Sequence, residues 1–83
     1  MKVQPFNRVS AIELYVLYEH PRDAPGQWVM RRWTIRQGAV QPVAGYALMA
    51  ADPEPLRRLM RDEGRVVMPR FDGDDPCIVE VWL

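Results

Sequence analysis

The sequence predicts a small α+β domain, with a largely antiparallel sheet of four to five strands and one helix packed on one face, in the order β-β-β-α-β-β. Runs rich in β-branched and aromatic residues recur along the 83 residues, separated by Gly, Pro and Asp turns. The segment 52–64 carries helix start and stop signals. Side chains along several runs sort into an apolar and a mixed set at period two, as strands require.

Length and composition predict one domain over residues 1–83, with an N-terminal arm at 1–10 and the sheet and helix at 11–83. The hydrophobic share of 48% is enough for a core. The first ten residues contain no apolar signal segment, and no run of about 18 apolar residues is present to span a membrane. Together with a single cysteine, Cys77, these features predict a cytoplasmic protein without a membrane contact.

The first two strands are predicted at 12–19 ("IELYVLYE") and 27–36 ("QWVMRRWTIR"). The breaker "HPRDAPG" separates them, so we expect a hairpin with a loop longer than two residues. Residues 42–50 are ambiguous, because their alanines permit a helix. Val43, Gly45 and Tyr46 after Pro42 nevertheless favour a third strand.

The helix is predicted from Asp52 as the N-cap and Pro53 at the first helical position to Gly64 as a left-handed stop. Glu54 at the positive end of the helix dipole is expected to pair with Arg58, four residues on. The predicted apolar stripe consists of Leu56, Leu59 and Met60. A short strand at 65–68, a turn at 71–76 and a final strand at 77–83 complete the chain.

Alternation divides the strands into two faces. One set is uniformly apolar, and we expect the helix to cover it: Ile12, Leu14, Val16, Tyr18, Val29, Trp33, Ile35, Cys77, Val79, Val81 and Leu83. The other set mixes aromatic, aliphatic and charged residues: Tyr15, Leu17, Trp28, Met30, Ile78 and Trp82 among Glu13, Glu19, Arg32, Arg36 and Glu80. On this interpretation Trp33 is structural and Trp28 is functional.

The second set is too apolar to stay exposed. Its three aromatic residues each bury about 150–250 Å² when covered, whereas the largest apolar patch of a typical monomer is about 300–600 Å². Three kinds of cover would fit it: the chain's own N-terminal arm or its 37–45 segment, a partner protein or second copy, and a nucleic acid.

Charge argues against a strongly basic nucleic-acid binder, because 11 basic and 11 acidic residues cancel. Residues 31–70 hold eight arginines against four acidic residues, an asymmetry that can orient a partner.

The sequence predicts no catalytic, cofactor or metal site. His20 is the single histidine, and the available nucleophiles Ser10, Thr34 and Cys77 occur in no recognisable catalytic motif. The acidic cluster "DGDD" at 72–75 lacks the spacing of a calcium loop.

The functional expectation is therefore a non-catalytic module that binds a partner protein or itself. Small inhibitors encoded by phages or mobile elements, anti-CRISPR-like proteins among them, take this form. The predicted partner-binding residues are Tyr15, Trp28, Met30, Arg32, Arg36 and Trp82. One alternative is a nucleic-acid-binding domain that uses Trp28, Arg32 and Arg36. The other is a small enzyme, which would need a cleft that holds His20 with Asp23 or Glu19.

Overall fold

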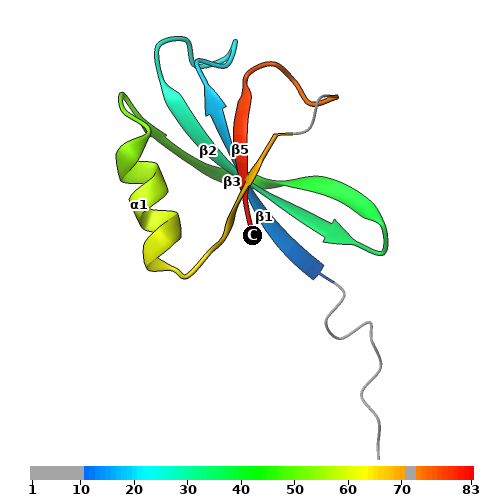
Figure 1. Cartoon of the computed structure of the whole chain (residues 1–83). Helices are drawn as coiled ribbons and strands as arrows, with labels where there is room; N and C mark the ends of the chain where they lie inside the picture. Colours follow the sequence, from blue (N-terminus) through cyan, green and yellow to red (C-terminus); the bar gives the residue numbers. More distant parts are fainter. Residues whose placement is uncertain (1–10, 71–72) are drawn as a thin grey trace, which may run out of the picture.

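A computed structural model describes residues 11–70 and 73–83 and shows an antiparallel five-stranded sheet with one helix (Figure 1). The elements are β1 (Ala11–Glu19), β2 (Trp28–Arg36), β3 (Ala39–Ala50), α1 (Glu54–Asp62), β4 (Val67–Pro69) and β5 (Ile78–Trp82). The predicted α+β class and element order are confirmed. The predicted N-terminal arm lies outside the described residues, as do positions 71–72 of the predicted turn.

The strands are ordered β3-β2-β1-β5-β4 across the sheet, so the first three form a meander and β5 inserts beside β1. The β1–β2 hairpin has the long loop that the breaker predicts, since Glu19 pairs with Trp28. A two-residue turn at Gln37 and Gly38 joins β2 to β3, and both residues have positive φ, 52° and 80°. That geometry matches the twist of paired strands, so β3 begins at Ala39. The prediction of a strand rather than a helix over 42–50 is confirmed.

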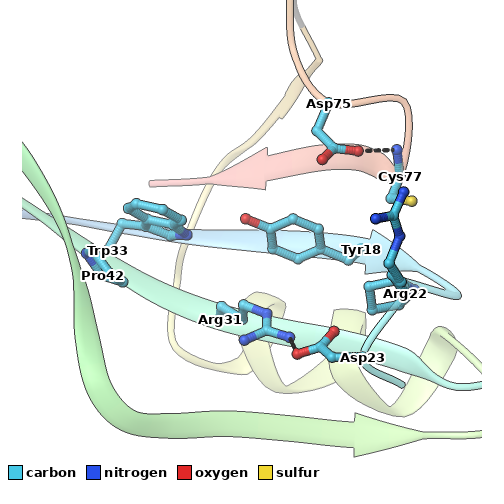
Figure 2. A pocket seen from close by; sticks show the side chains of 9 residues that line it. Tyr18, Arg22, Asp23, Arg31, Trp33, Pro42, Asp75 and Cys77 are labelled. Atoms are coloured by element: carbon cyan, nitrogen blue, oxygen red, sulfur yellow. Dashed lines mark hydrogen bonds and ion pairs between the residues drawn. The ribbon is translucent and has the colours of Figure 1, made fainter. Parts of the chain in front are cut away.

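β3 is strongly bent at its middle. Its pairing with β2 jumps from Arg31 opposite Ala47 to Trp33 opposite Pro42, so residues 43–46 stand opposite Arg32 alone. Gly45 adopts a φ of 80° within this bulge, a conformation that glycine adopts at no steric cost. Extra residues on one strand bend it and increase the local twist, and the bend is visible in Figure 2.

Local hydrogen bonds mark both ends of the helix. An Asp52 carboxylate oxygen accepts the backbone N–H of Glu54 at 2.9 Å, although the helix itself starts one residue later than predicted, after Pro53. At the other end Gly64 has a φ of 76° and donates to the Arg61 carbonyl, while the next backbone N–H, that of residue 65, reaches back to residue 60. This pair of bonds satisfies the last carbonyls of the helix. Across the described ranges, no helix is long and apolar enough to span a membrane.

The helix covers the mixed face of the sheet, so the prediction that it covers the uniformly apolar face is wrong. The buried core cluster is Tyr15, Leu17, Met30, Leu56, Met60 and Trp82. Trp28, Tyr46, Leu48 and Ala50 pack against it. Neither the N-terminal arm nor the 37–45 segment is needed as a cover in this arrangement.

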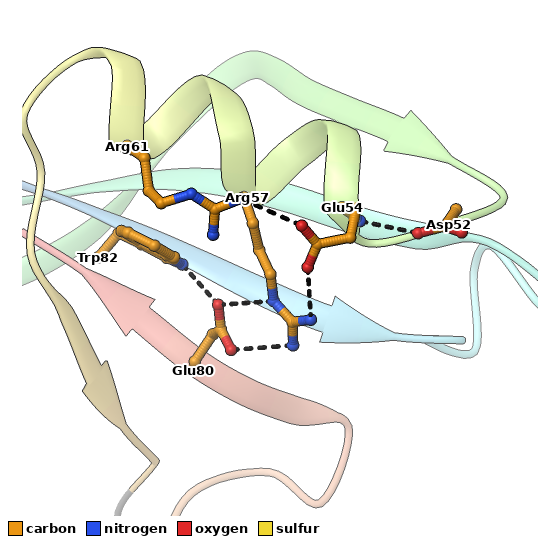
Figure 3. A network of polar contacts seen from close by, with 6 residues as sticks. All are labelled: Asp52, Glu54, Arg57, Arg61, Glu80 and Trp82. Atoms are coloured by element: carbon orange, nitrogen blue, oxygen red, sulfur yellow. Dashed lines mark hydrogen bonds and ion pairs between the residues drawn. The ribbon is translucent and has the colours of Figure 1, made fainter.

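Charge complementarity explains which face the helix selects. Arg57 on α1 donates two hydrogen bonds to the Glu80 carboxylate, at 3.1 and 3.0 Å, and the indole N–H of Trp82 donates a third at 2.8 Å (Figure 3). The Arg65 guanidinium lies 4.1 Å from the centre of the Tyr15 ring and donates to its hydroxyl at 3.3 Å. The Glu80 carboxylate and the Tyr15 phenol on this face are therefore partnered by arginines in and just after the helix.

Two details of the helix differ from prediction. The buried stripe is narrower, because Leu56 and Met60 are 5% and 0% exposed whereas Leu59 is 38% exposed. Glu54 pairs with Arg57 at 3.3 Å and Arg61 at 3.1 Å rather than with Arg58 (Figure 3).

Candidate functional site: the helix-free face and its pocket

The side of the sheet opposite α1 is here called the helix-free face. Directly paired residues share a face of the sheet, and the registers of β1, β2 and β3 place four rows on this side. The rows are Ile12–Ile35–Val40, Leu14–Trp33–Pro42, Val16–Arg31–Ala47 and Tyr18–Val29–Met49. Val81 extends the third row across β5 and Met68 extends it across β4. Arg31 is the single charged residue in these four rows.

Exposure on this face is uneven. Val16 and Val29, on the interior strands β1 and β2, are buried by their neighbours. Ile12 and Val40 in the first row are 54% and 56% exposed, and Met49 in the fourth is 61% exposed. The two ends of the face therefore present apolar side chains to solvent.

An open pocket of about 720 Å³ lies on the same face, between Trp33 and the β1–β2 loop (Figure 2). Its apolar lining comes from Tyr18, Pro21, Trp33, Pro42 and Cys77. Its charged lining comes from Arg22, Asp23, Arg31 and Asp75. The volume falls within the range of ligand pockets, about 300–1,000 Å³. The bend of β3 helps to form it, because it carries Pro42 to a position opposite Trp33.

Three of the four charged side chains around the pocket, Asp23, Arg31 and Asp75, are held by partners within the chain. Arg31 donates to Asp23 at 2.6 Å, and this hydrogen bond holds the pKa of the Asp23 carboxyl below its usual range. The Arg31 guanidinium also lies 5.5 Å from the centre of the Tyr18 ring. Asp75 accepts the backbone N–H of Cys77 at 2.8 Å and so fixes the turn before β5. The charged lining consists of two arginines and two aspartates, so it is electrically balanced.

Tyr18 and Trp33 provide the aromatic part of the pocket. A phenol is ordinarily protonated at physiological pH, and burial raises the pKa of the Tyr18 hydroxyl further, so this group is a neutral donor and acceptor. The indole N–H of Trp33 points toward this hydroxyl (Figure 2) and partly opposes the increase in its pKa. The contact lacks the geometry of a full hydrogen bond, and the Trp33 Nε1 atom is shielded from solvent. The rings therefore offer mainly apolar surface with one polar group, the phenol.

The structure does not bring the candidate catalytic residues Cys77 and His20 together in one site. Burial, reinforced by Asp75, raises the pKa of the Cys77 thiol, which disfavours the nucleophilic thiolate. His20 packs edge-to-face on Trp28, with ring centres 5.9 Å apart, and does not line the pocket. Within 11–70 and 73–83, no group of three or more His, Cys, Asp or Glu residues is placed to hold a metal ion. Position 72 of the acidic cluster lies outside those ranges.

The six predicted partner-binding residues are not brought together on an accessible surface. Tyr15, Met30 and Trp82 are 4%, 0% and 3% exposed beneath α1. Trp28 packs against the same core. Arg32 stands over the Tyr46 ring at 5.2 Å and pairs with Glu13 at 3.6 Å, and Arg36 is exposed at the end of β2. The proposed nucleic-acid set of Trp28, Arg32 and Arg36 therefore forms no stacking platform.

Sequence reasoning missed Tyr18, Arg31, Trp33 and Pro42 as site residues, because it placed Tyr18 and Trp33 in the helix-covered core. A signal was present in the helix itself. Its apolar stripe is narrow and flanked by arginines, so it suits a face that carries carboxylates such as Glu13 and Glu80 better than a wholly apolar one.

Residues of three strands and two loops thus converge on one apolar, electrically balanced pocket.

Comparison with protein-family models, with curated proteins and with solved structures finds no match to this chain.

Proposed function

We propose that this protein is a non-catalytic interaction module that binds a partner protein or a second copy of itself through the helix-free face. One observation carries the proposal: four cross-strand rows that contain a single charged residue face away from the helix. Exposed, contiguous apolar surface on a soluble domain marks an interaction site.

The composition of the face supports the same conclusion. Interface hot spots are enriched in Trp, Tyr and Arg, and the pocket contains Trp33, Tyr18 and Arg31. These side chains project from paired strands, and Arg31 is held by Asp23. A partner therefore meets groups whose positions are already fixed, which reduces the entropy cost of binding.

Paired glutamate substitutions test this proposal. Met49→Glu places a charge on the helix-free face, and Val67→Glu places the same charge opposite Trp82 on the helix side of the sheet. Both residues are well exposed, at 61% and 47%, so both variants should fold. The tagged wild-type chain is used to capture proteins from a lysate of the source organism, and a captured partner is then purified for affinity measurement.

We expect Met49→Glu to weaken that purified complex about 30-fold or more, the hot-spot threshold of about 2 kcal/mol. Val67→Glu should bind like the wild type. Unchanged binding by Met49→Glu together with lost binding by Val67→Glu would move the interface to the helix side and refute the proposal.

A further inference from the structure

The charged groups that line the pocket of the helix-free face do not all neutralise one another. Arg31 and Asp23 form an ion pair at 2.6 Å. The Arg22 guanidinium makes no hydrogen bond or ion pair with another residue in the described parts of the chain. Asp75 accepts the backbone N–H of Cys77, but no arginine of those parts pairs with its carboxylate. The pocket therefore holds one cation and one anion without a charged partner.

These two unpaired charges lie at the same end of the pocket, around Cys77. Burial raises the pKa of the Cys77 thiol, the Asp75 carboxylate adds to that increase, and Arg22 opposes it. Both side chains thus lie within electrostatic reach of one sulfur atom, and both are exposed. They form no ion pair with each other, so a gap remains between the guanidinium and the carboxylate.

The other end of the pocket is apolar. Trp33 and Pro42 lie there, on the far side of the Tyr18 ring from Arg22 (Figure 2). Pro42 is exposed and the two aromatic side chains are half-buried, so all three offer surface to a bound molecule. A ring that packs against them gains free energy from the apolar area that it removes from water. The pocket is thus amphipathic, with an apolar end and an end that carries both signs of charge.

This arrangement selects the chemistry of the ligand. A simple carboxylate would pair with Arg22 but bring a like charge beside Asp75, and a simple amine would do the reverse. A nucleotide would bring several negative charges to the same place. An α-amino acid carries a carboxylate and an ammonium group on one carbon and projects its side chain away from them. It therefore pairs with both charges while its side chain enters the apolar end.

We propose that the pocket binds a free α-amino acid with a large apolar side chain. Its carboxylate pairs with Arg22, its ammonium group pairs with Asp75, and its side chain packs against Tyr18, Trp33 and Pro42. This binding site goes beyond the protein-interaction role proposed above and does not depend on it.

Four compounds that share a phenyl ring separate the contribution of each charge. L-Phenylalanine carries both charged groups, phenylpropionate only the carboxylate, phenethylamine only the ammonium group, and N-acetylphenylalanine amide neither. Each is titrated at neutral pH into the isotope-labelled chain, and the dissociation constant is measured from the NMR chemical shifts. We expect L-phenylalanine to bind most tightly of the four and to shift the signal of the Trp33 indole N–H.

Two variants assign the charges to their partners. Arg22→Gln and Asp75→Asn each remove one charge from an exposed side chain, and asparagine can still accept the Cys77 N–H. Arg22→Gln should weaken L-phenylalanine binding about fivefold, the upper end of what one exposed ion pair contributes, without weakening phenethylamine. Asp75→Asn should weaken L-phenylalanine to the same extent without weakening phenylpropionate. Arg36→Gln removes an exposed charge outside the pocket and should change neither.

Three results would overturn the inference. L-Phenylalanine that shifts no pocket signal up to its solubility limit would show that the pocket takes no amino acid. Equal binding of N-acetylphenylalanine amide would show that the pocket selects apolar surface alone. An equal loss of binding in Arg36→Gln would show that the charge effect is not local. These results leave the proposed protein interface standing, because Met49, whose substitution tests it, does not line the pocket.

Discussion

Replacement of Trp82 by alanine is expected to lower the free energy of unfolding by about 3–5 kcal/mol, the range for emptying an aromatic core site. Trp82 is 3% exposed beneath α1, and its indole N–H donates to Glu80 at 2.8 Å (Figure 3). The substitution therefore leaves a cavity and also removes one of the donors that hold the Glu80 carboxylate against the helix. Since small domains are stable by about 5–15 kcal/mol, this loss is a large share of the total free energy of unfolding and should lower the denaturation midpoint markedly.

Urea denaturation followed by circular dichroism measures the effect, with Trp82→Phe as its control. Phenylalanine retains an aromatic ring but lacks the donor, so its cost should fall between wild type and alanine. A Trp82→Ala midpoint equal to that of the wild type would mean that this ring is on the surface and that the helix covers the other face.

The second large effect is expected at Met60. Met60→Ala should cost about 2–5 kcal/mol, because the side chain is fully buried between the helix and the sheet. Leu59→Ala should cost about 1 kcal/mol or less, because that side chain is 38% exposed and surface substitutions have small effects. Leucine and methionine have similar helix propensities, and the two residues are adjacent in the same helix, so the comparison isolates the effect of burial. A larger cost at Leu59 than at Met60 would show that the helix is rotated relative to this structure.

The elements of the fold were predictable because their signals are local. Asp52 and Gly64 delimit the helix through backbone groups that lie only a few residues away. Gln37 and Gly38 set the tight turn between β2 and β3 by their own backbone angles. The strand at 42–50 was ambiguous because a bulge interrupts its alternation, and only pairing with β2 reveals its full length.

The local sequence pattern alone does not show which face of the sheet the helix covers. Alternation correctly separated Trp28 from Trp33, but it does not state which set a helix will cover. The set that contains Trp33 is uniformly hydrophobic, and this property favoured it as the helix-covered face. The deciding contacts, Arg57 to Glu80 and Arg65 to Tyr15, join residues 23 and 50 positions apart in sequence. Partners at that distance let polar groups such as the Glu80 carboxylate lie partly buried with their hydrogen bonds satisfied.

The location of the candidate site depends on which face of the sheet the helix covers. Its residues Tyr18 and Trp33 were identified in the sequence but placed in the helix-covered core, and Trp28 was placed on the outside. The pocket itself depends on the bend of β3 and on the loop that carries Asp75, and neither leaves a periodic signal in the sequence.

The central claim is that the helix covers the Tyr15, Leu17 and Met30 side of the sheet and leaves the opposite side open. Four methionines report on it, since oxidation of a methionine requires an accessible sulfur. Met49 is 61% exposed on the helix-free face, Met68 is partly buried, and Met30 and Met60 are fully buried. The most direct measurement is the rate of sulfoxide formation at each methionine in dilute hydrogen peroxide, read by peptide mass spectrometry. We expect Met49 to oxidise at a rate close to that of the unfolded chain, with Met30 and Met60 strongly protected. Rapid oxidation of Met30 with protection of Met49 would contradict the account, because it would place the helix on the other face.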